Sequence, residues 1–251
     1  MKIEVENLCF SYSKHQILKK LNFSATEGEL IALLGPNGVG KTTFFRCLLG
    51  FLKPSDGTIS VNGRDINKYS RKDLARQIAY IPQSYSPAFN HTVLDCVLMG
   101  VTSQLGIFET PDEKAKQKAL GVLESLGMQD LAYKGCMKIS GGERQLMLLA
   151  RALVQDAGFL IMDEPTSNLD FGNTYRVMEK IKKIKEQGYT IMFSTHDPNL
   201  AVNYASRIIA MKDGKIIADG KPETIDAEVF NSIYNVNVSV CKQCNSIRIV
   251  Q

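Results

Sequence analysis

The stretch Gly35-Pro-Asn-Gly-Val-Gly-Lys-Thr-Thr43 decides the fold. The apolar run Glu29–Leu34 before it has the composition of a strand, and Thr42–Leu49 after it has a helical pattern that ends at Gly50. Glycines let successive main-chain N–H groups converge on phosphate oxygens, and the start of a helix adds a partial positive charge there. A glycine-rich turn that merely joins two elements would rarely stand between such neighbours. The context therefore indicates a phosphate-binding loop of the Walker A type.

Phosphoryl transfer needs a cation for the phosphates, a divalent metal and a base for the attacking water, and the chain offers a candidate for each. Lys41 is placed to reach the β- and γ-phosphates, and Thr42 to ligate Mg²⁺ through its hydroxyl. Asp163 and Glu164 follow the apolar run Phe159–Met162, which predicts a buried strand. Asp163 suits the metal shell, and Glu164 suits the general base. Adjacent acids at a strand end often only face solvent, but the apolar run before these two favours a site.

Two further polar residues stand just after predicted strands. His196 follows the apolar strand Tyr189–Ser194, and Gln83 follows Gln77–Ile81. Ligands collect beyond the carboxyl ends of parallel strands, so we expect His196 to bond a γ-phosphate. Gln83 is expected to ligate Mg²⁺ or water and to act as a hinge. In isolation, either residue would more often be ordinary polar surface.

A second phosphate site is indicated by Ile139-Ser-Gly-Gly-Glu-Arg-Gln145. Ser140 and Glu143 have the spacing of a capping box, so the segment could simply start a helix well. Gly141 and Gly142 weaken that explanation, because glycine costs about 1 kcal/mol relative to alanine inside a helix. Glycines are also expected where a backbone approaches another molecule closely. Two phosphate-binding sites in one chain fit a reciprocal dimer, in which Ser140 of one copy and Lys41 of the other bind the same nucleotide.

In this order the motifs resemble those of the ATP-binding cassette (ABC) ATPases, and the resemblance covers residues 1 to about 225. It implies that Ile139–Gln145 is the signature motif and that Ser167-Asn-Leu-Asp170 is the D-loop. Ile139 stands where leucine is commoner and Glu143 where glutamine is frequent, but neither departure affects the assignment. The resemblance also implies that Tyr12 stacks on adenine, with a simple packing role in a hairpin as the alternative.

The resulting prediction names ATP and Mg²⁺ as the bound groups. The predicted catalytic residues are Glu164, His196, Lys41 and Gln83; the ATP-binding residues are Tyr12, Gly35, Pro36, Asn37, Gly38, Val39, Gly40, Lys41, Thr42 and Thr43; the Mg²⁺ ligands are Thr42, Gln83 and Asp163. The residues contributed to the partner copy are Ser140, Gly141, Gly142 and Glu143, together with Asp170 of the D-loop.

Composition sets limits on this interpretation. The chain has 251 residues, is 44% hydrophobic and carries a formal net charge of +4, with no clustered basic stripe, so we expect no nucleic-acid partner. No apolar run approaches the ~18–20 residues that cross a bilayer, and the acidic start Met1–Glu6 predicts a strand and not a signal peptide. Six scattered cysteines suggest reduced thiols in the cytosol. Cys241 and Cys244 supply only half of a four-ligand zinc site.

The elements predict an α/β fold with a P-loop NTPase (RecA-like) core, a mostly parallel sheet, an antiparallel β subdomain and an inserted α-helical subdomain. We assign the core to residues 1–83 and 140–225, the helical subdomain to 84–139 and a C-terminal tail to 226–251. Within the helical subdomain, Thr110 is expected to cap a helix that Gly127 ends. The tail from Asn231 onward has no recognisable pattern.

The resemblance implies an ATPase subunit at the cytoplasmic face of the inner membrane, working with a second copy of itself and two membrane-spanning permease subunits. Leu94–Gly100 and Leu105–Phe108 resemble cassettes of importers for metal chelates, cobalamin, haem or oxyanions, which would also use a substrate-binding protein outside the membrane. An exporter ATPase or a lone cytosolic ABC ATPase of the iron–sulfur assembly type stays open as an alternative.

Overall fold

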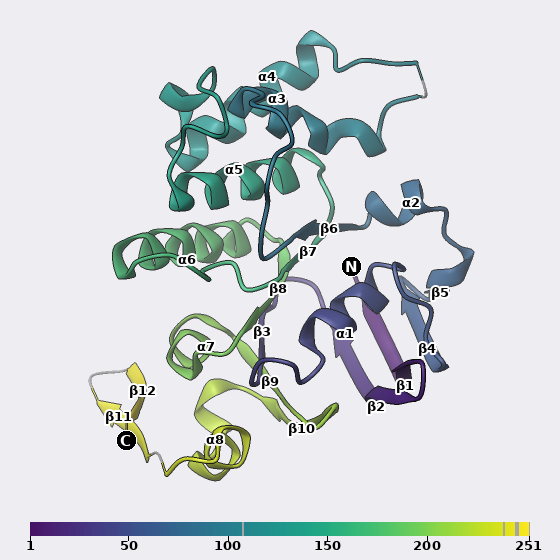
Figure 1. Ribbon diagram of the computed structural model, residues 1–251, viewed down its shortest axis with the longest axis vertical. Coiled ribbons are helices and arrows are strands. Elements are labelled where there is room, and N and C mark those ends of the chain that lie inside the picture. The colour runs from purple at the N-terminus through teal and green to yellow at the C-terminus, as the bar shows by residue number, and fades with distance from the viewer. Residues whose placement is uncertain (107, 238, 244–245, 251) are drawn as a thin grey trace.

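A largely parallel sheet forms the centre of the molecule, in a computed structural model that describes residues 1–106, 108–237, 239–243 and 246–250 (Figure 1). The described residues give this sheet six strands in the order β10-β9-β3-β8-β7-β6. They are β3 (Leu30–Leu34), β6 (Ile78–Ile81), β7 (Phe159–Met162), β8 (Thr190–Thr195), β9 (Arg207–Lys212) and β10 (Lys215–Gly220). Neighbours run parallel from β9 to β6, and β10 pairs antiparallel with β9. This arrangement confirms the predicted α/β class.

A smaller antiparallel sheet lies beside it, in the order β2-β1-β4-β5. Its strands are β1 (Ile3–Tyr12), β2 (His15–Ala25), β4 (Asp56–Val61) and β5 (Arg64–Asp65). The turn between β1 and β2 is short, because Tyr12 at the end of β1 pairs with His15 at the start of β2. Ser13 has a φ of 52°, which lets two residues reverse the chain.

Both faces of the main sheet are buried, as parallel strands joined by helices require. In β3, Ile31 and Leu33 pack into one core, whereas Ala32 and Leu34 pack into the other. The first core is closed by α1 (Lys41–Leu48) and the antiparallel sheet. The second is closed by α5 (Gly141–Val154), α6 (Phe171–Glu186) and α7 (Pro198–Tyr204). The helices thus hold the carboxyl ends of β3, β7 and β8 in fixed positions along one edge.

Helices dominate the chain between β6 and α5. The elements there are α3 (Val93–Leu98), η2 (Met99–Ser103), α4 (Glu113–Leu126) and η3 (Gln129–Leu131), and α2 (Arg71–Ala75) precedes β6. Among the described residues of this stretch, only an isolated bridge between Thr92 and Gly135 has β character. α3 and α4 pack on α5 and form one end of the molecule (Figure 1).

The predicted start of α4 is wrong by two residues. Asp112, not Thr110, is the N-cap, and its Oδ1 accepts a hydrogen bond of 2.7 Å from the Ala115 N–H. Aspartate caps at least as well as threonine, so the second capping residue in the sequence competes successfully with the first. The predicted end is confirmed, because Gly127 is the C-cap with φ 74°.

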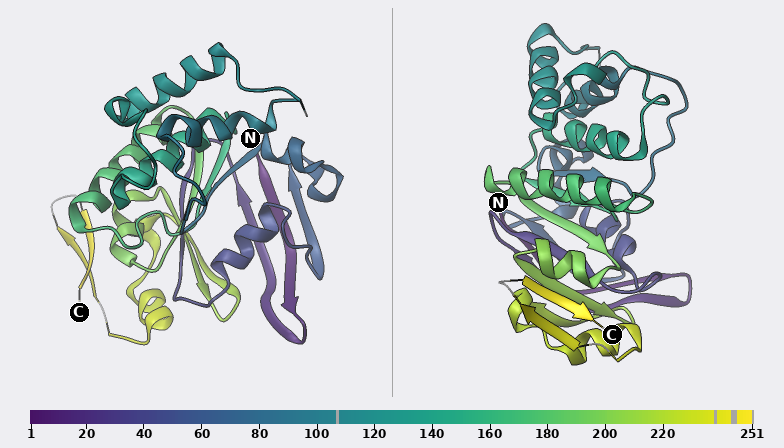
Figure 2. Two further views of the ribbon diagram at one scale, coloured as in Figure 1. Left: turned by 45° about the horizontal axis from the view of Figure 1, so that its top comes forward. Right: turned by 90° about the vertical axis from the view of Figure 1, so that its left-hand side faces the viewer.

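The C-terminal residues form elements that the sequence did not reveal. α8 (Ala227–Tyr234) lies against β9, and the hairpin of β11 (Ser239–Gln243) and β12 (Ser246–Val250) lies beside α7 (Figure 2). Cys244 lies outside the described residues, so the structure does not test the zinc interpretation of Cys241 and Cys244. In the part of the chain that the structure describes, no helix combines the length and apolar character needed to cross a membrane.

Candidate active site

The phosphate-binding loop connects β3 to α1 and surrounds the Lys41 ammonium. Its Nζ donates to the main-chain oxygens of Gly35 at 2.7 Å and Pro36 at 3.1 Å, and the residue is only 5% exposed. Burial lowers the pKa of Lys41, while the carboxylates of Glu164 and Asp163 act in the opposite direction. Gly40 precedes Lys41 with φ 111°, and a Cβ there would lie 2.9 Å from Leu18, so only glycine fits.

Glu164 brings the predicted catalytic residues together. Its Oε1 lies 3.7 Å from Lys41 Nζ and 3.4 Å from His196 Nδ1, and its Oε2 accepts a hydrogen bond of 3.2 Å from Gln83 Nε2. The Glu164 side chain is 11% exposed, whereas the His196 side chain is 54% exposed. The three partners follow β3, β6 and β8, so the strand ends do converge as the sequence predicted. A carboxylate held by donors on three sides is fixed in place for proton abstraction.

Ser194, to which the sequence analysis gave no role, supports both acids. Its hydroxyl accepts a hydrogen bond of 2.9 Å from the Glu164 main-chain N–H and donates one of 2.6 Å to Asp163 Oδ1. The Glu164 backbone has a φ of 45°, in the left-handed region, which costs a non-glycine residue ~1–2 kcal/mol. Ser194 is completely buried in β8 and stabilises this strained turn directly.

We expect Ser194→Ala to lower kcat for ATP hydrolysis by about tenfold and to lower the free energy of unfolding by about 1–3 kcal/mol, because it leaves a buried N–H and a buried carboxylate oxygen without partners. Steady-state hydrolysis and thermal unfolding would measure the two effects. Ser206→Ala is a matched control, since the Ser206 hydroxyl likewise accepts from and donates to the main chain of Leu30, away from this site. An unchanged kcat in Ser194→Ala would contradict the supporting role.

Two cavities meet at Glu164. One, of about 330 Å³, is lined by Gly38, Gly40, Lys41, Thr42, Thr43, Asn37, Ile17, Gln83 and Glu164. The other, of about 460 Å³, is shared by Glu164, His196 and the D-loop segment from Ser167 to Leu169. The loop residues that would hold phosphates and the residues that would attack them therefore border one continuous region.

The oxygen donors at this site suit a hard cation such as Mg²⁺. Thr42 and Gln83 line the first cavity together, whereas Asp163 is 2% exposed and lines neither cavity. Asp163 Oδ2 also accepts a hydrogen bond of 3.5 Å from the Tyr80 hydroxyl. Burial raises the pKa of Tyr80 to about 12, and the negative charge of Asp163 acts in the same direction. The described residues contain no group of three or more His, Cys, Asp or Glu that could hold a metal alone. Phosphate oxygens would have to complete the shell.

The signature segment begins α5 with the capping box predicted as the simpler alternative. Ser140 Oγ accepts from the Glu143 N–H at 3.3 Å, and Glu143 Oε2 accepts from the Ser140 N–H at 2.7 Å. The second bond lowers the pKa of Glu143. A side-chain hydrogen bond with Ser140 lowers the pKa of Glu143 further. Ser140 and Gly141 are exposed, and residues 140–143 line neither cavity at Glu164.

Contacts within the chain also explain why a glycine stands at position 142. A Cβ at this position would lie 2.8 Å from Oδ1 of Asn173, a residue in the first turn of α6. Asn173 in turn donates through its main-chain N–H and side-chain Nδ2 to the carboxylate of Asp170, at 2.7 and 2.9 Å. One asparagine therefore joins the start of the signature helix to the end of the D-loop.

Tyr12 is not brought to either cavity at Glu164. Its ring packs edge-on against Phe10 at a centroid distance of 4.8 Å, and 44% of the residue remains exposed. This packing fits the simpler role of a hairpin tyrosine, and the exposed part leaves adenine stacking as a prediction. His15, Gln16 and Ile17, just beyond the turn, border the phosphate-binding loop instead.

The fold and the site define a P-loop protein that hydrolyses nucleoside triphosphates. Comparison with known families places it further: residues 18–167 match the model of the ABC transporter family, and residues 136–203 match that of an AAA domain. The chain belongs to the ABC transporter ATP-binding family, whose members bind ATP and act as ATPases.

Individual relatives extend over nearly the whole chain. A Helicobacter pylori protein named "Probable iron chelatin transport ATP-binding protein" is 40% identical over 94% of this chain and 93% of its own length. The phosphonates import ATP-binding protein PhnC 2 of Oceanobacillus iheyensis is 36% identical over 92% and 95%. A solved ABC transporter assigned to the metal-chelate type, in an inward-facing conformation, superposes with a TM-score of 0.86 at 30% identity, covering 98% of this chain and 95% of that one.

Proposed function

We propose that this chain is the ATP-hydrolysing subunit of an ABC importer, in which two copies close around two Mg-ATP and reopen after hydrolysis. The observation that carries the proposal is the convergence of Lys41, Gln83 and His196 on the Glu164 carboxylate, within 3.7 Å. These groups supply phosphate neutralisation, a hinge, a γ-phosphate contact and a base, which is nearly all that phosphoryl transfer requires.

In this proposal each residue has one task. Lys41 neutralises the β- and γ-phosphates, and His196 bonds the γ-phosphate through its exposed imidazole. Glu164 accepts a proton from the attacking water. Thr42, Gln83 and Asp163 would hold Mg²⁺, which supplies charge neutralisation between the β- and γ-phosphate oxygens.

The second copy is needed because the signature helix lies away from its own phosphate-binding loop. Ser140 and Gly141 are exposed at the start of a helix of 14 residues, where main-chain N–H groups and the helix dipole favour an anion. A two-fold related copy would bring this helix to the phosphates that Lys41 holds. Phe171, 89% exposed directly after the D-loop, fits a surface that a partner covers.

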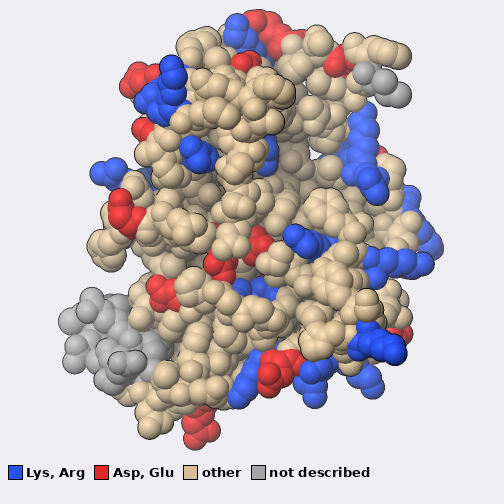
Figure 3. Space-filling view, viewed as in Figure 1, with Lys and Arg blue, Asp and Glu red and all other residues tan. Residues whose placement is uncertain are grey.

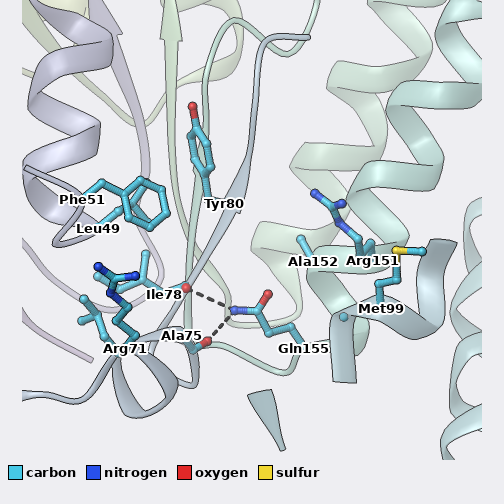
Figure 4. Close-up of a pocket in the computed structure, with 12 residues that line it drawn as sticks. Leu49, Phe51, Arg71, Ala75, Ile78, Tyr80, Met99, Arg151, Ala152 and Gln155 are labelled. Carbon is cyan, nitrogen blue, oxygen red and sulfur yellow. Dashed lines mark hydrogen bonds between the residues drawn. The ribbon is translucent and has the colours of Figure 1, made fainter. Parts of the chain in front are cut away.

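A groove between the sheet and the helical end of the molecule fits a permease segment (Figure 4). Its volume is about 310 Å³, and its lining comes from Leu49, Phe51, Arg71, Leu74, Ala75, Ile78, Tyr80, Met99, Gly100, Arg151, Ala152 and Gln155. Phe51 and Met99 are 65% and 39% exposed at the groove, an apolar surface suited to a short helix of a membrane subunit. Tyr80 links the groove to the site, because its hydroxyl bonds Asp163.

Charge beside the groove supports docking at a membrane. Lys and Arg side chains gather on the side of the molecule that carries α2 and the antiparallel sheet (Figure 3). Arg71, Lys72 and Arg76 of this region are exposed. Basic residues near a cytoplasmic leaflet are each worth ~1 kcal/mol of attraction to anionic lipid. This fits a subunit at the cytoplasmic face of the membrane.

For the transported substrate, we propose a metal chelate. This rests on relatives named for iron chelatin transport and for a metal-chelate transporter, with phosphonates as the second class suggested by a relative. A substrate-binding protein outside the membrane would deliver it to the permease.

Co-purification with a membrane-spanning permease, for which a permease gene next to this one would be the first candidate, tests the proposal. Phe51→Asp in the groove should reduce the recovered permease at least about tenfold, because it buries a charge at an apolar contact, while ATP binding stays unchanged. Phe108→Asp is the matched control, since Phe108 is 98% exposed and does not line the groove. Vesicles carrying the complex should take up a ferric chelate when ATP is present on the side of this subunit. ATP-driven movement of the chelate toward the side of the membrane that carries this subunit would be uptake; movement away from that side would contradict the importer.

A further inference from the structure

The C-terminal helix contacts the segment that carries His196. Tyr234, the last residue of α8, donates a hydrogen bond of 2.8 Å from its hydroxyl to the main-chain oxygen of His196. The two residues are 38 positions apart in the sequence, so this is a tertiary contact and not a local turn. Nothing in the catalytic motifs requires a tyrosine here.

α8 is a firm support for this tyrosine. Phe230 and Ile233 are 0% and 4% exposed and pack into the core that also contains Ile208 and Ala210 of β9. Asn235 ends the helix in the left-handed conformation with φ 54°, and its N–H donates to the Asn231 oxygen at 2.8 Å. The Tyr234 ring therefore starts from a fixed backbone.

The residues around His196 are fixed on their other sides by local bonds. The Thr195 oxygen accepts from the Gly35 N–H at 3.3 Å, and Thr195 Oγ1 accepts from the Asp197 N–H at 3.0 Å. Asp197 then caps α7 through the Asn199 N–H at 2.8 Å, and β12 lies beside α7. The Tyr234 bond adds a tether to the peptide of the histidine itself.

We propose that Tyr234 is a positioning residue for ATP hydrolysis, which fixes the His196 peptide so that its imidazole points toward Glu164 and the γ-phosphate. The inference rests on the proposed function, because it takes His196 to act in hydrolysis. The imidazole is 54% exposed with Nδ1 3.4 Å from Glu164 Oε1, so little packing holds the ring and its direction depends on the backbone. Burial raises the pKa of Tyr234, with Asp197 acting in the same direction, so the hydroxyl stays protonated as a donor at neutral pH.

The first test is Tyr234→Phe in the full chain, which removes the hydroxyl and keeps the ring. We expect kcat for ATP hydrolysis to fall about threefold to tenfold, the effect of one neutral hydrogen bond. The KM and Kd for ATP should stay within about twofold, and Tm should fall by no more than about 4 °C. Tyr204→Phe is the matched control, because Tyr204 is a half-buried tyrosine at the end of α7. Its hydroxyl makes no hydrogen bond to another described residue, so the kcat of the Tyr204→Phe variant should match that of the wild type.

A second readout follows the histidine directly. The chain contains three histidines, so the ring signals of a protein labelled at histidine can be assigned by single substitutions. Tyr234→Phe should shift or broaden the His196 signal, whereas the signals of His15 and His91 should stay in place. Tyr204→Phe should move none of the three.

The outcomes separate this inference from the proposed function. A shifted His196 signal with an unchanged kcat would show that Tyr234 positions the histidine but that His196 does not act in hydrolysis, which overturns the inference as stated and counts against the proposed role of His196. An unchanged His196 signal would overturn the positioning role, while His196→Ala would still test the proposed function on its own. A Tm fall of more than about 8 °C together with a raised KM would mean a merely structural tyrosine and would also overturn it.

Discussion

Lys41→Ala is expected to weaken ATP binding by about 30-fold to 3,000-fold. The ammonium is buried within the phosphate-binding loop, and removing a charge that pairs with a buried phosphate costs about 2–5 kcal/mol. Alanine keeps the helix, so the fold should survive the change. Binding of a fluorescent ATP analogue to the purified variant would measure the loss.

Lys116→Ala provides the control, because the Lys116 ammonium makes an exposed contact of 3.9 Å with Glu113 within α4, away from the site. It should bind ATP like the wild type. An unchanged ATP affinity in Lys41→Ala would refute the phosphate contact, and with it the interpretation of the loop.

Glu164→Gln is expected to lower kcat by about 10²–10⁴-fold and to accumulate an ATP-bound dimer, because the amide cannot accept a proton from water. The amide keeps the size of the side chain and can still accept from Gln83 Nε2, which lies 3.2 Å from Glu164 Oε2. It also removes a negative charge that lies 3.4 Å from His196 and 3.7 Å from Lys41, which favours a bound triphosphate. Size-exclusion chromatography with ATP and Mg²⁺ would show the dimer.

Glu27→Gln makes the same chemical change far from the site, at an exposed carboxylate that pairs with the N-terminus at 2.9 Å. It should hydrolyse ATP at the wild-type rate and elute as the wild type does. If Glu164→Gln stays monomeric with ATP and Mg²⁺ at micromolar concentration, the two-nucleotide dimer is wrong.

Much of the fold follows from local signals in the sequence. The apolar runs at 30–34, 159–162 and 190–195 became buried parallel strands, because their residues suit a sheet covered on both faces. The misplaced start of α4 shows the limit of such signals, since Thr110 and Asp112 are both good caps and only packing decides between them. The boundaries of the helical subdomain at 84 and 139 stay a prediction.

The C-terminal helix and hairpin could not be predicted from the sequence, because they are stabilised by packing against distant parts of the chain. α8 has eight residues, too few to be stable alone, and depends on the burial of Phe230 and Ile233. An isolated two-stranded hairpin such as β11–β12 is also marginal without packing, here provided by α7.

The residues of the site that follow directly after strands could be predicted from the sequence. The residues that support them through hydrogen bonds were not predicted. Lys41, Gln83, Glu164 and His196 meet because parallel strands deliver their carboxyl ends to one edge. Ser194 could have been found by the same reasoning, because β7 and β8 are neighbours and Met162 pairs with Phe193, which sets Ser194 beside Asp163. Tyr234 gave no signal, since its partner is a main-chain oxygen on a distant segment.

Asn173 links the signature helix to the D-loop, two segments that the proposed dimer would present to the partner copy. Its side chain lies against Gly142 and bonds Asp170, so the serine of the signature helix and the aspartate of the D-loop cannot shift independently. In the proposed dimer, a signature helix that moves away from its phosphate after hydrolysis would therefore carry Asp170 with it. Hydrolysis at one ATP site would then change the position of Asp170 at the dimer interface, so the two sites would be coupled.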